Sequence, residues 1–261
     1  MRYLRLLFTF LRIGVIGELA YRANFFFQLL ESVIELGTAL AGLAIIFSYT
    51  GSLGGWRPDE VLALVGVYFL AGGGIGLLIQ PSMQQFIESV RDGTLDFTLT
   101  MPEDAQLLSS IQRVEIWKLT DVGIGAGVIG VALARLGSSV SAVHALQFAA
   151  ALLAGAVIVY SFWLILAAFA FWFVRVENIL VIFQSMYDAG RWPVSLYPGW
   201  LRFALTFLVP VAFAVTVPAQ ALAGRLDWLT LAGAWALAVA LFAAARLFWR
   251  AGLRRYSGAS A

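Results

Sequence analysis

Residue types that carry chemistry are scarce in this chain, and their spacing excludes several common sites. Cysteine is absent and His144 is the single histidine, so one chain cannot build a zinc site from Cys and His ligands. Lys118 is the single lysine and follows Trp117, so the phosphate-binding loop G-x-x-x-x-G-K-[ST] does not occur. If the protein uses ATP, another chain must hydrolyse it.

Four polar residues, Asn24, Gln28, Glu31 and Glu35, lie within or just before the first long apolar stretch. Their steps of four, three and four place them on one face of a helix. An acid inside the hydrocarbon is costly and must face protein or water. Glu31 and Glu35 are therefore expected either to line a polar translocation path, or to contact a partner subunit, or to lie at headgroup level where the span begins.

Composition identifies the environment that these residues share. Of the 261 residues, 61% are hydrophobic and 12% are charged, and the mean hydropathy is +0.88. A soluble domain has roughly 45–50% apolar and about 25% charged residues, so a single soluble domain is excluded. The apolar runs are continuous rather than alternating, which excludes an outer-membrane barrel. A net charge of +2 gives no argument for nucleic-acid binding.

The apolar runs predict an all-α, polytopic membrane protein with six transmembrane helices in a single domain, residues 1–261. Each span needs about 20 apolar residues. Between residues 176 and 226 we expect one full crossing, followed by an outer turn and a re-entrant helical hairpin over 191–226, because Pro210 and Pro218 interrupt that run. The other spans are predicted at residues 26–48, 61–80, 119–136, 145–173 and 228–248.

The N-terminal segment 1–23 predicts an amphipathic helix lying in the headgroup region, an elbow before the first span. Its apolar residues follow the spacing of one helix face, and the arginines that interrupt it exclude the unbroken apolar core of a cleaved signal. The alternative is that this segment simply begins the first span. The interrupting arginines are Arg2, Arg5, Arg12 and Arg22.

Orientation follows from the basic residues, which favour the cytoplasmic side. Six spans with the N-terminus inside place most of the 17 basic residues in the cytoplasm, including the arginine-rich tail. Both termini are therefore predicted to be cytoplasmic. The residues left outside are Arg57, Arg135, Arg191, Arg202 and Arg225.

Two glycine pairs have the small-xxx-small spacing that lets helix backbones approach closely. They are Gly72 with Gly76 and Gly123 with Gly127. Both pairs predict tight helix packing, either within one subunit or between two subunits.

The most informative segment is E-S-V-R-D-G-T-L-D-F-T-L-T-M-P at residues 88–102, inside the one long polar stretch, residues 81–118. It resembles the R-x-G-T-L-[DE]-x-x-L-x-x-P pattern of the membrane subunits of type-2 ABC transporters. The segments 21–24 and 192–201 and the order of elements also fit that family, in particular its bacterial, daunorubicin-exporter-like branch. The residues that match the pattern are Arg91, Gly93, Thr94, Leu95, Asp96, Leu99 and Pro102.

This resemblance implies a permease subunit of an ATP-driven exporter in the bacterial cytoplasmic (inner) membrane. It implies two separate ABC ATPase subunits, which bind ATP and Mg²⁺, and a second permease that is identical or paralogous; this chain would bind no cofactor itself. The cytoplasmic loop 81–118 would dock on the ATPase, with Arg91, Asp92 and Asp96 as polar contacts and Gly93 providing a bend. The implied substrate is a drug, a lipid or a polysaccharide-type molecule.

Other functions, and another interpretation of the loop, are alternatives to this one. The loop could be solvated without a partner. An ion-driven secondary transporter usually has repeated halves with broken helices at the midplane, and residues 1–130 and 131–261 show no self-similarity. A membrane enzyme would need a catalytic set, but no G-x-S-x-G motif surrounds the serines near His144.

Overall fold

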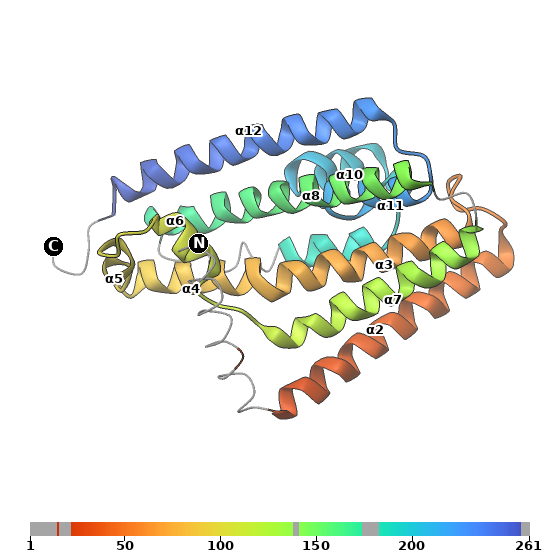
Figure 1. Ribbon diagram of the computed structural model, residues 1–261, viewed down its shortest axis with the longest axis horizontal. Coiled ribbons are helices and arrows are strands. Elements are labelled where there is room, and N and C mark those ends of the chain that lie inside the picture. The colour runs from red at the N-terminus through yellow and green to blue at the C-terminus, as the bar shows by residue number, and fades with distance from the viewer. Residues whose placement is uncertain (1–14, 16–21, 138–140, 174–182, 257–261) are drawn as a thin grey trace.

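The computed structural model describes residue 15 and residues 22–137, 141–173 and 183–256, and no strand occurs in these ranges. Figure 1 shows long helices running roughly side by side, with shorter helices at one end and between them. The all-α, polytopic fold predicted from the sequence is confirmed. The predicted elbow over residues 1–23 lies almost entirely outside the described ranges.

Within the described ranges, five helical segments are long and apolar enough to cross a membrane, and a sixth is possible if a bent helix pair counts as one span. The first is α2 (Arg22–Tyr49). The third is α7 (Leu119–Leu136), preceded by η2 (Ile116–Lys118). The fourth combines α8 (Ala142–Ala168) with η4 (Phe169–Phe171), and the last is α12 (Trp228–Leu253).

The second segment is a continuous helical rod from Pro58 to Arg91, longer than the predicted span at 61–80. It consists of α3 (Pro58–Gly74), the π-helical η1 (Ile75–Ile79) and α4 (Gln80–Arg91). Pro58 opens it at a position where a missing N–H costs nothing. The helix ends after Arg91, with Asp92 as its C-cap. The next residue, Gly93, has a φ of +71°, a backbone conformation that favours glycine. The rod therefore extends directly into the polar stretch 81–118.

Two glycines set the close contact between α3 and α7. A Cβ on Gly125 would lie 2.4 Å from the Leu70 nitrogen, and one on Gly66 would lie 2.9 Å from the Ile129 nitrogen. An added Cβ at Gly123 or Gly127 would meet nothing within 4 Å. The close approach is thus made at Gly66 and Gly125, which belong to neither predicted pair. In the other predicted pair, an added Cβ would lie 3.2 Å from Tyr187 at Gly72 and 3.1 Å from Lys118 at Gly76.

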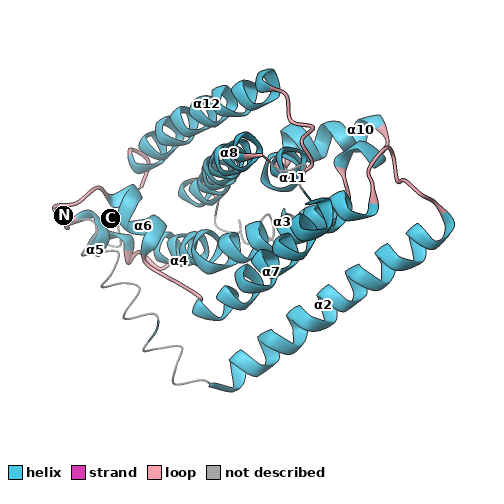
Figure 2. Cartoon of the chain, turned by 45° about the vertical axis from the view of Figure 1, so that its right-hand side comes forward, coloured by secondary structure: helices cyan, strands magenta, loops and turns pink. Residues whose placement is uncertain are grey.

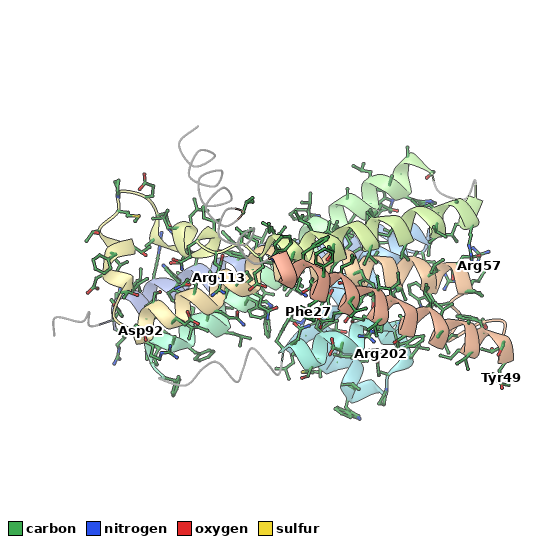
Figure 3. All side chains as sticks on the ribbon, turned by 90° about the horizontal axis from the view of Figure 1, so that it is seen from below. Phe27, Tyr49, Arg57, Asp92, Arg113 and Arg202 are labelled. Carbon is green, nitrogen blue, oxygen red and sulfur yellow. The ribbon has the colours of Figure 1, made fainter. Side chains whose placement is uncertain are left out.

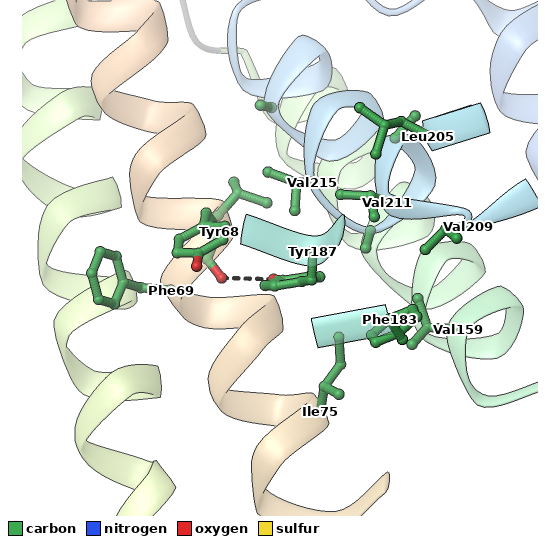
Figure 4. Close-up of a cluster of buried hydrophobic side chains, with 14 of the residues drawn as sticks. Tyr68, Phe69, Ile75, Val159, Phe183, Tyr187, Leu205, Val209, Val211 and Val215 are labelled. Atoms are coloured by element: carbon green, nitrogen blue, oxygen red, sulfur yellow. Dashed lines mark hydrogen bonds between the residues drawn. The ribbon is translucent and has the colours of Figure 1, made fainter. Parts of the chain in front are cut away.

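The bundle core is aromatic and aliphatic. Trp163 of α8 is fully buried and its ring lies 4.8 Å from the ring of Phe183. Tyr187 stacks on Tyr68 at 5.1 Å between ring centroids and donates a hydrogen bond of 2.8 Å to the Tyr68 carbonyl. Figure 4 shows Tyr187 beside Tyr68 of α3, with their hydrogen bond as a dashed line. The core thus joins residues 183–191 to the rod.

The segment after residue 183 is irregular and sharply bent. It includes η5 (Asp188–Arg191), η6 (Val194–Leu196), α10 (Gly199–Phe203) and η7 (Ala204–Leu208). It then turns into η8 (Ala212–Thr216) and α11 (Val217–Leu222), and the two halves, 199–208 and 212–222, meet at 80°. The predicted crossing before this hairpin falls partly on residues 174–182, which lie outside the described ranges.

The connecting segments gather at two opposite ends of the bundle. Figure 3 shows Asp92 at one end and Tyr49 and Arg57 at the other. Figure 2 shows α2 and α12 at opposite edges, with α3 and α7 between them. At the Tyr49 end the carboxylate of Glu60, which is 2% exposed, accepts from Arg57 at 3.3 Å and from Arg225 at 2.7 Å. Because Arg225 lies between α11 and α12, its ion pair with Glu60 joins that connecting segment to the start of α3.

Candidate functional site

In the part of the chain that the structure describes, two polar regions are candidates for a functional site: the projecting turn after Arg91 and a cavity beside α2. The turn consists of Asp92 and Gly93, the short helix α5 (Leu95–Leu99), and the helix α6 (Ala105–Ile111) that returns to the bundle. We call residues 92–104 the α5 loop.

The α5 loop has one buried anchor and an exposed apolar tip. Leu95 is fully buried, whereas Phe97 is 71% exposed and Met101 is 48% exposed. Of the residues predicted to make polar contacts, Arg91 and Asp92 are exposed, and Arg91 Nε lies 3.1 Å from Asp92 Oδ1. Such exposed apolar side chains beside charges are typical of an interaction surface.

Each predicted loop residue can now be placed. Leu95 is the first residue of α5 and is buried against the protein, where it anchors the loop. Gly93 makes the bend. Phe97 and Met101 were missed by sequence reasoning, although the alternation of apolar residues with the buried Leu95 was available as a signal. The remaining predicted residues are exposed or half-buried at the loop surface: Thr94, Asp96, Leu99 and Pro102.

A polar clamp fastens the α5 loop to the last span. The carboxylate of Asp104 caps α6 by accepting from the backbone N–H groups of Gln106 at 3.0 Å and Leu107 at 3.2 Å. Arg246 of α12 donates to both Asp104 oxygens and, at 2.6 Å, to Gln106 Oε1. The Arg246 hydrogen bond, with smaller contributions from the capped N–H groups, lowers the pKa of Asp104.

The clamp extends to α8. Tyr160 of α8 accepts from Gln106 Nε2 at 3.2 Å and its hydroxyl lies 2.7 Å from Ser110 Oγ. On the opposite side of the loop, Ser82 of α4 donates to the Arg113 carbonyl at 2.8 Å. The α5 loop and the residues that follow it, up to Arg113, are therefore attached to α4, α8 and α12.

The second region is a cavity of about 860 Å³ beside α2, within the usual size range of small-molecule sites. It is lined by α2, by the α3–η1 part of the rod, by residues 115–121 and by residues 184–191. Aromatic side chains such as Phe27, Phe69 and Tyr187 form part of its wall. Acids outnumber bases among the charged lining residues, which are Glu31, Glu35, Glu115, Lys118, Asp121, Asp188 and Arg191.

Glu35 and Arg191 form an ion pair in this cavity at 2.5 Å. The Tyr68 hydroxyl lies 3.1 Å from Glu35 Oε1 and 3.2 Å from Asp188 Oδ1, so it can donate to either acid. Glu35 is about 20 Å along α2 from the end at Tyr49, at 1.5 Å per residue. Arg191 therefore lies deep beside α2, whereas the sequence placed it with the outer turn. A charge at this position along α2 is tolerated because the arginine is paired.

A second polar contact joins α2 to α7. Ser32, which is 1% exposed, donates to Asp121 Oδ1, and Asp121 Oδ2 accepts from Lys118 at 3.3 Å.

Glu31 is exposed and has no polar partner in the part of the chain that the structure describes. Gln28 donates to Ser32 Oγ at 3.2 Å. Asn24 belongs to α2, but its side chain lies outside the described part. Of the predicted stripe, Glu31 and Glu35 line the cavity, whereas Gln28 does not.

These features define a class: a polytopic membrane subunit with a charged cavity between its helices and a projecting loop fastened to them. Residues 33–260 match the family model for ABC-2 family transporter proteins, and the chain belongs to that family. Members of this family are transmembrane permease subunits that work with an ABC ATPase. Neither the curated proteins nor the solved structures gave a match.

Proposed function

We propose that this chain exports its substrate by responding to ATP hydrolysis in two partner ATPase subunits, which hold the ATP and Mg²⁺. The observation that carries this proposal is the α5 loop, whose exposed Phe97 and Met101 project beside charged residues while Leu95 and the Asp104–Arg246 clamp fix its base. The loop is suited to fill a groove on a partner. Arg91, Asp92 and Asp96 would then contact the groove rim.

Movement of the ATPase would reach the membrane helices through the clamp. Arg246 transfers displacement of the loop to α12, Tyr160 transfers it to α8, and the continuous rod transfers it from Gly93 to α3. The rod also forms one wall of the polar cavity. Rotation of the rod would therefore change the width of the cavity, which is how a loop in the cytoplasm can control access to a site within the membrane.

The polar cavity is the proposed segment of the substrate path in this subunit. Glu31 is unpaired among the described residues and points to a polar function for this wall, because an acid at membrane depth needs water or a partner. A second permease, identical or paralogous, would complete the path. The proposed setting is the bacterial inner membrane with both termini in the cytoplasm, and the proposed substrate is a drug, a lipid or a polysaccharide-type molecule.

The experiment is nucleotide-dependent labelling of a single cysteine in native membranes. The chain has no cysteine, so Glu31→Cys introduces one thiol at the cavity and Tyr49→Cys introduces a control at the far end of α2. Labelling of position 31 by a small water-soluble thiol reagent should change when ATP and vanadate trap the complex, and position 49 should label equally in both states.

The outcome separates the proposal from its alternatives. If position 31 labels identically with and without the nucleotide trap, but changes when an ion gradient is imposed, the protein is an ion-driven transporter and the proposal is wrong. If position 31 is never labelled, the cavity holds no water and is not the path.

A further inference from the structure

A second, apolar hollow lies on the other side of α2, and it has no part in the proposed function. Its volume is about 580 Å³, and it lies between α2, α7 and the first turns of α3. Its walls are hydrocarbon along most of their length. Representative lining residues are Leu36, Leu43 and Phe47 of α2, Leu62 of α3, and Ile124 and Val131 of α7. We call it the α2–α7 groove.

The groove has the depth of one membrane leaflet. Its lining runs from Leu36 to Phe47 on α2 and from Ile124 to Arg135 on α7, which is about 16 Å at 1.5 Å per residue. Half of a hydrocarbon core of about 30 Å is about 15 Å. At the deep end, one turn below Leu36, the hydrogen bond between Ser32 and Asp121 brings α2 against α7 and closes the groove.

The shallow end of the groove carries one cation and one anion. Arg135 Nη1 lies 4.0 Å from Asp59 Oδ1, and the two side chains are 64% and 38% exposed. This separation exceeds the length of a hydrogen bond, and neither side chain makes another polar contact in the described part of the chain. Both groups therefore have hydrogen-bonding capacity left for a ligand at the membrane surface.

We infer that the α2–α7 groove binds one phospholipid with an ethanolamine headgroup, from the leaflet at the Tyr49 end. One acyl chain fills the apolar groove, because its depth and lining match a single leaflet. The phosphate accepts from the Arg135 guanidinium, whose planar donors suit phosphate oxygens. The primary ammonium group donates N–H groups to Asp59, which the trimethylammonium group of a choline headgroup cannot do. The headgroup thus supplies the opposite charge to each member of the pair.

Charge complementarity distinguishes this lipid from an anionic one. Phosphatidylglycerol has a phosphate but no ammonium, so binding it would leave the Asp59 carboxylate beside the phosphate with no cation of its own. A second copy of the chain is the other possible occupant of an apolar helix face. Packing a helix there would have to cover Arg135 and Asp59, and its occurrence is one outcome of the test below.

Two glycines of α7 provide a matched pair of variants. Gly127 lines the groove, Gly130 does not, and an added Cβ at either residue would meet nothing within 4 Å. Gly127→Leu should therefore fill the groove, and Gly130→Leu should add the same side chain to the same helix outside it. Leucine is a better helix former than glycine, so both variants are expected to fold.

The test uses the full-length chain in phosphatidylcholine bilayers that contain a trace of phosphatidylethanolamine with a photoactivatable acyl chain. After irradiation, adducts are mapped by mass spectrometry. Adducts should concentrate on residues 36–47 and 124–135 in the unmodified chain and in Gly130→Leu, and should fall by about fivefold in Gly127→Leu. Unlabelled phosphatidylethanolamine should compete about fivefold better than phosphatidylglycerol, the size of effect that one exposed ion pair gives.

The headgroup assignment has its own variants, which leave the groove walls unchanged. Arg135→Gln combined with Asp59→Asn should abolish the preference between the two competitors while adducts remain in the groove. The inference is overturned if adducts are equal in Gly127→Leu and the unmodified chain, or if Gly130→Leu loses as much. It is also overturned if the unmodified chain shows no adducts there because a second copy covers the face. Should Gly127→Leu fail to fold, the competition experiment still decides.

Discussion

Removing Arg246 should loosen the α5 loop without disturbing the spans. In Arg246→Ala, Asp104 loses both hydrogen bonds from the guanidinium and Gln106 loses one. The Asp104 cap on α6 remains, because its acceptor bonds from Gln106 and Leu107 do not need the arginine. The expected result is more frequent local opening of α6 and of the α5 loop that it supports.

The free energy that the clamp contributes depends on how exposed its two charged side chains are. A hydrogen bond to a charged group contributes about 1.5–3 kcal/mol when well buried, and an exposed ion pair contributes about 0.2–1 kcal/mol. The side chains of Arg246 and Asp104 are 31% and 37% exposed, so the clamp lies between these limits, at about 1–2 kcal/mol. That corresponds to an increase of about 5- to 30-fold in the local opening equilibrium.

Hydrogen exchange measures this opening directly. The backbone amides of residues 105–111 should lose protection by about 5- to 30-fold in Arg246→Ala, while amides in the middle of α3 keep theirs. Arg250→Ala is the matched control, since Arg250 lies one turn further along α12, is exposed, and has no partner in the described part of the chain. If both variants change α6 equally, the clamp does not hold the loop.

Three further predictions use the same chain. Ser257→Cys should resist an impermeant thiol reagent applied to intact cells, because the basic residues place the C-terminus inside; labelling from outside would refute the orientation. The purified chain alone should hydrolyse no ATP, since Lys118 is in no phosphate loop; activity that survives removal of contaminants would refute this. Because the pKa of Asp104 is lowered, the stability difference between the native chain and Asp104→Asn should be constant from pH 8 to about pH 5 and shrink below about pH 4; loss near neutral pH would contradict the clamp.

The spans could be predicted because membrane crossing is a local property of the sequence. The predicted span 119–136 coincides with α7 (Leu119–Leu136), and Gly93 makes the bend after the rod. The hydropathy of a span is a sum over its own residues, so it can be read without knowing how the neighbouring helices pack. The end of the second span was less predictable, because the helix continues through polar residues to Arg91 once α6 and α8 pack against it.

The polar contacts could not be predicted because they join residues far apart in the chain. Arg191 pairs with Glu35 and Arg246 pairs with Asp104, and each pairing depends on how the helices are rotated and how deep each segment lies. The stripe from Asn24 to Glu35 indicated one polar face on α2, but not its partners. Gly66 and Gly125 were equally hidden, because neither has a small residue four positions away and only the packing of α3 against α7 reveals them.

The most direct test of the central claim is site-specific cross-linking from the tip of the α5 loop. A photo-crosslinking amino acid replaces Phe97, which is 71% exposed, and in a control it replaces Tyr49, which is 88% exposed at the opposite end of the bundle. After irradiation of intact cells, position 97 should be joined to a protein that carries the phosphate-binding loop G-x-x-x-x-G-K-[ST], and position 49 should not. Absence of such an adduct at position 97, or equal capture at position 49, would contradict the account.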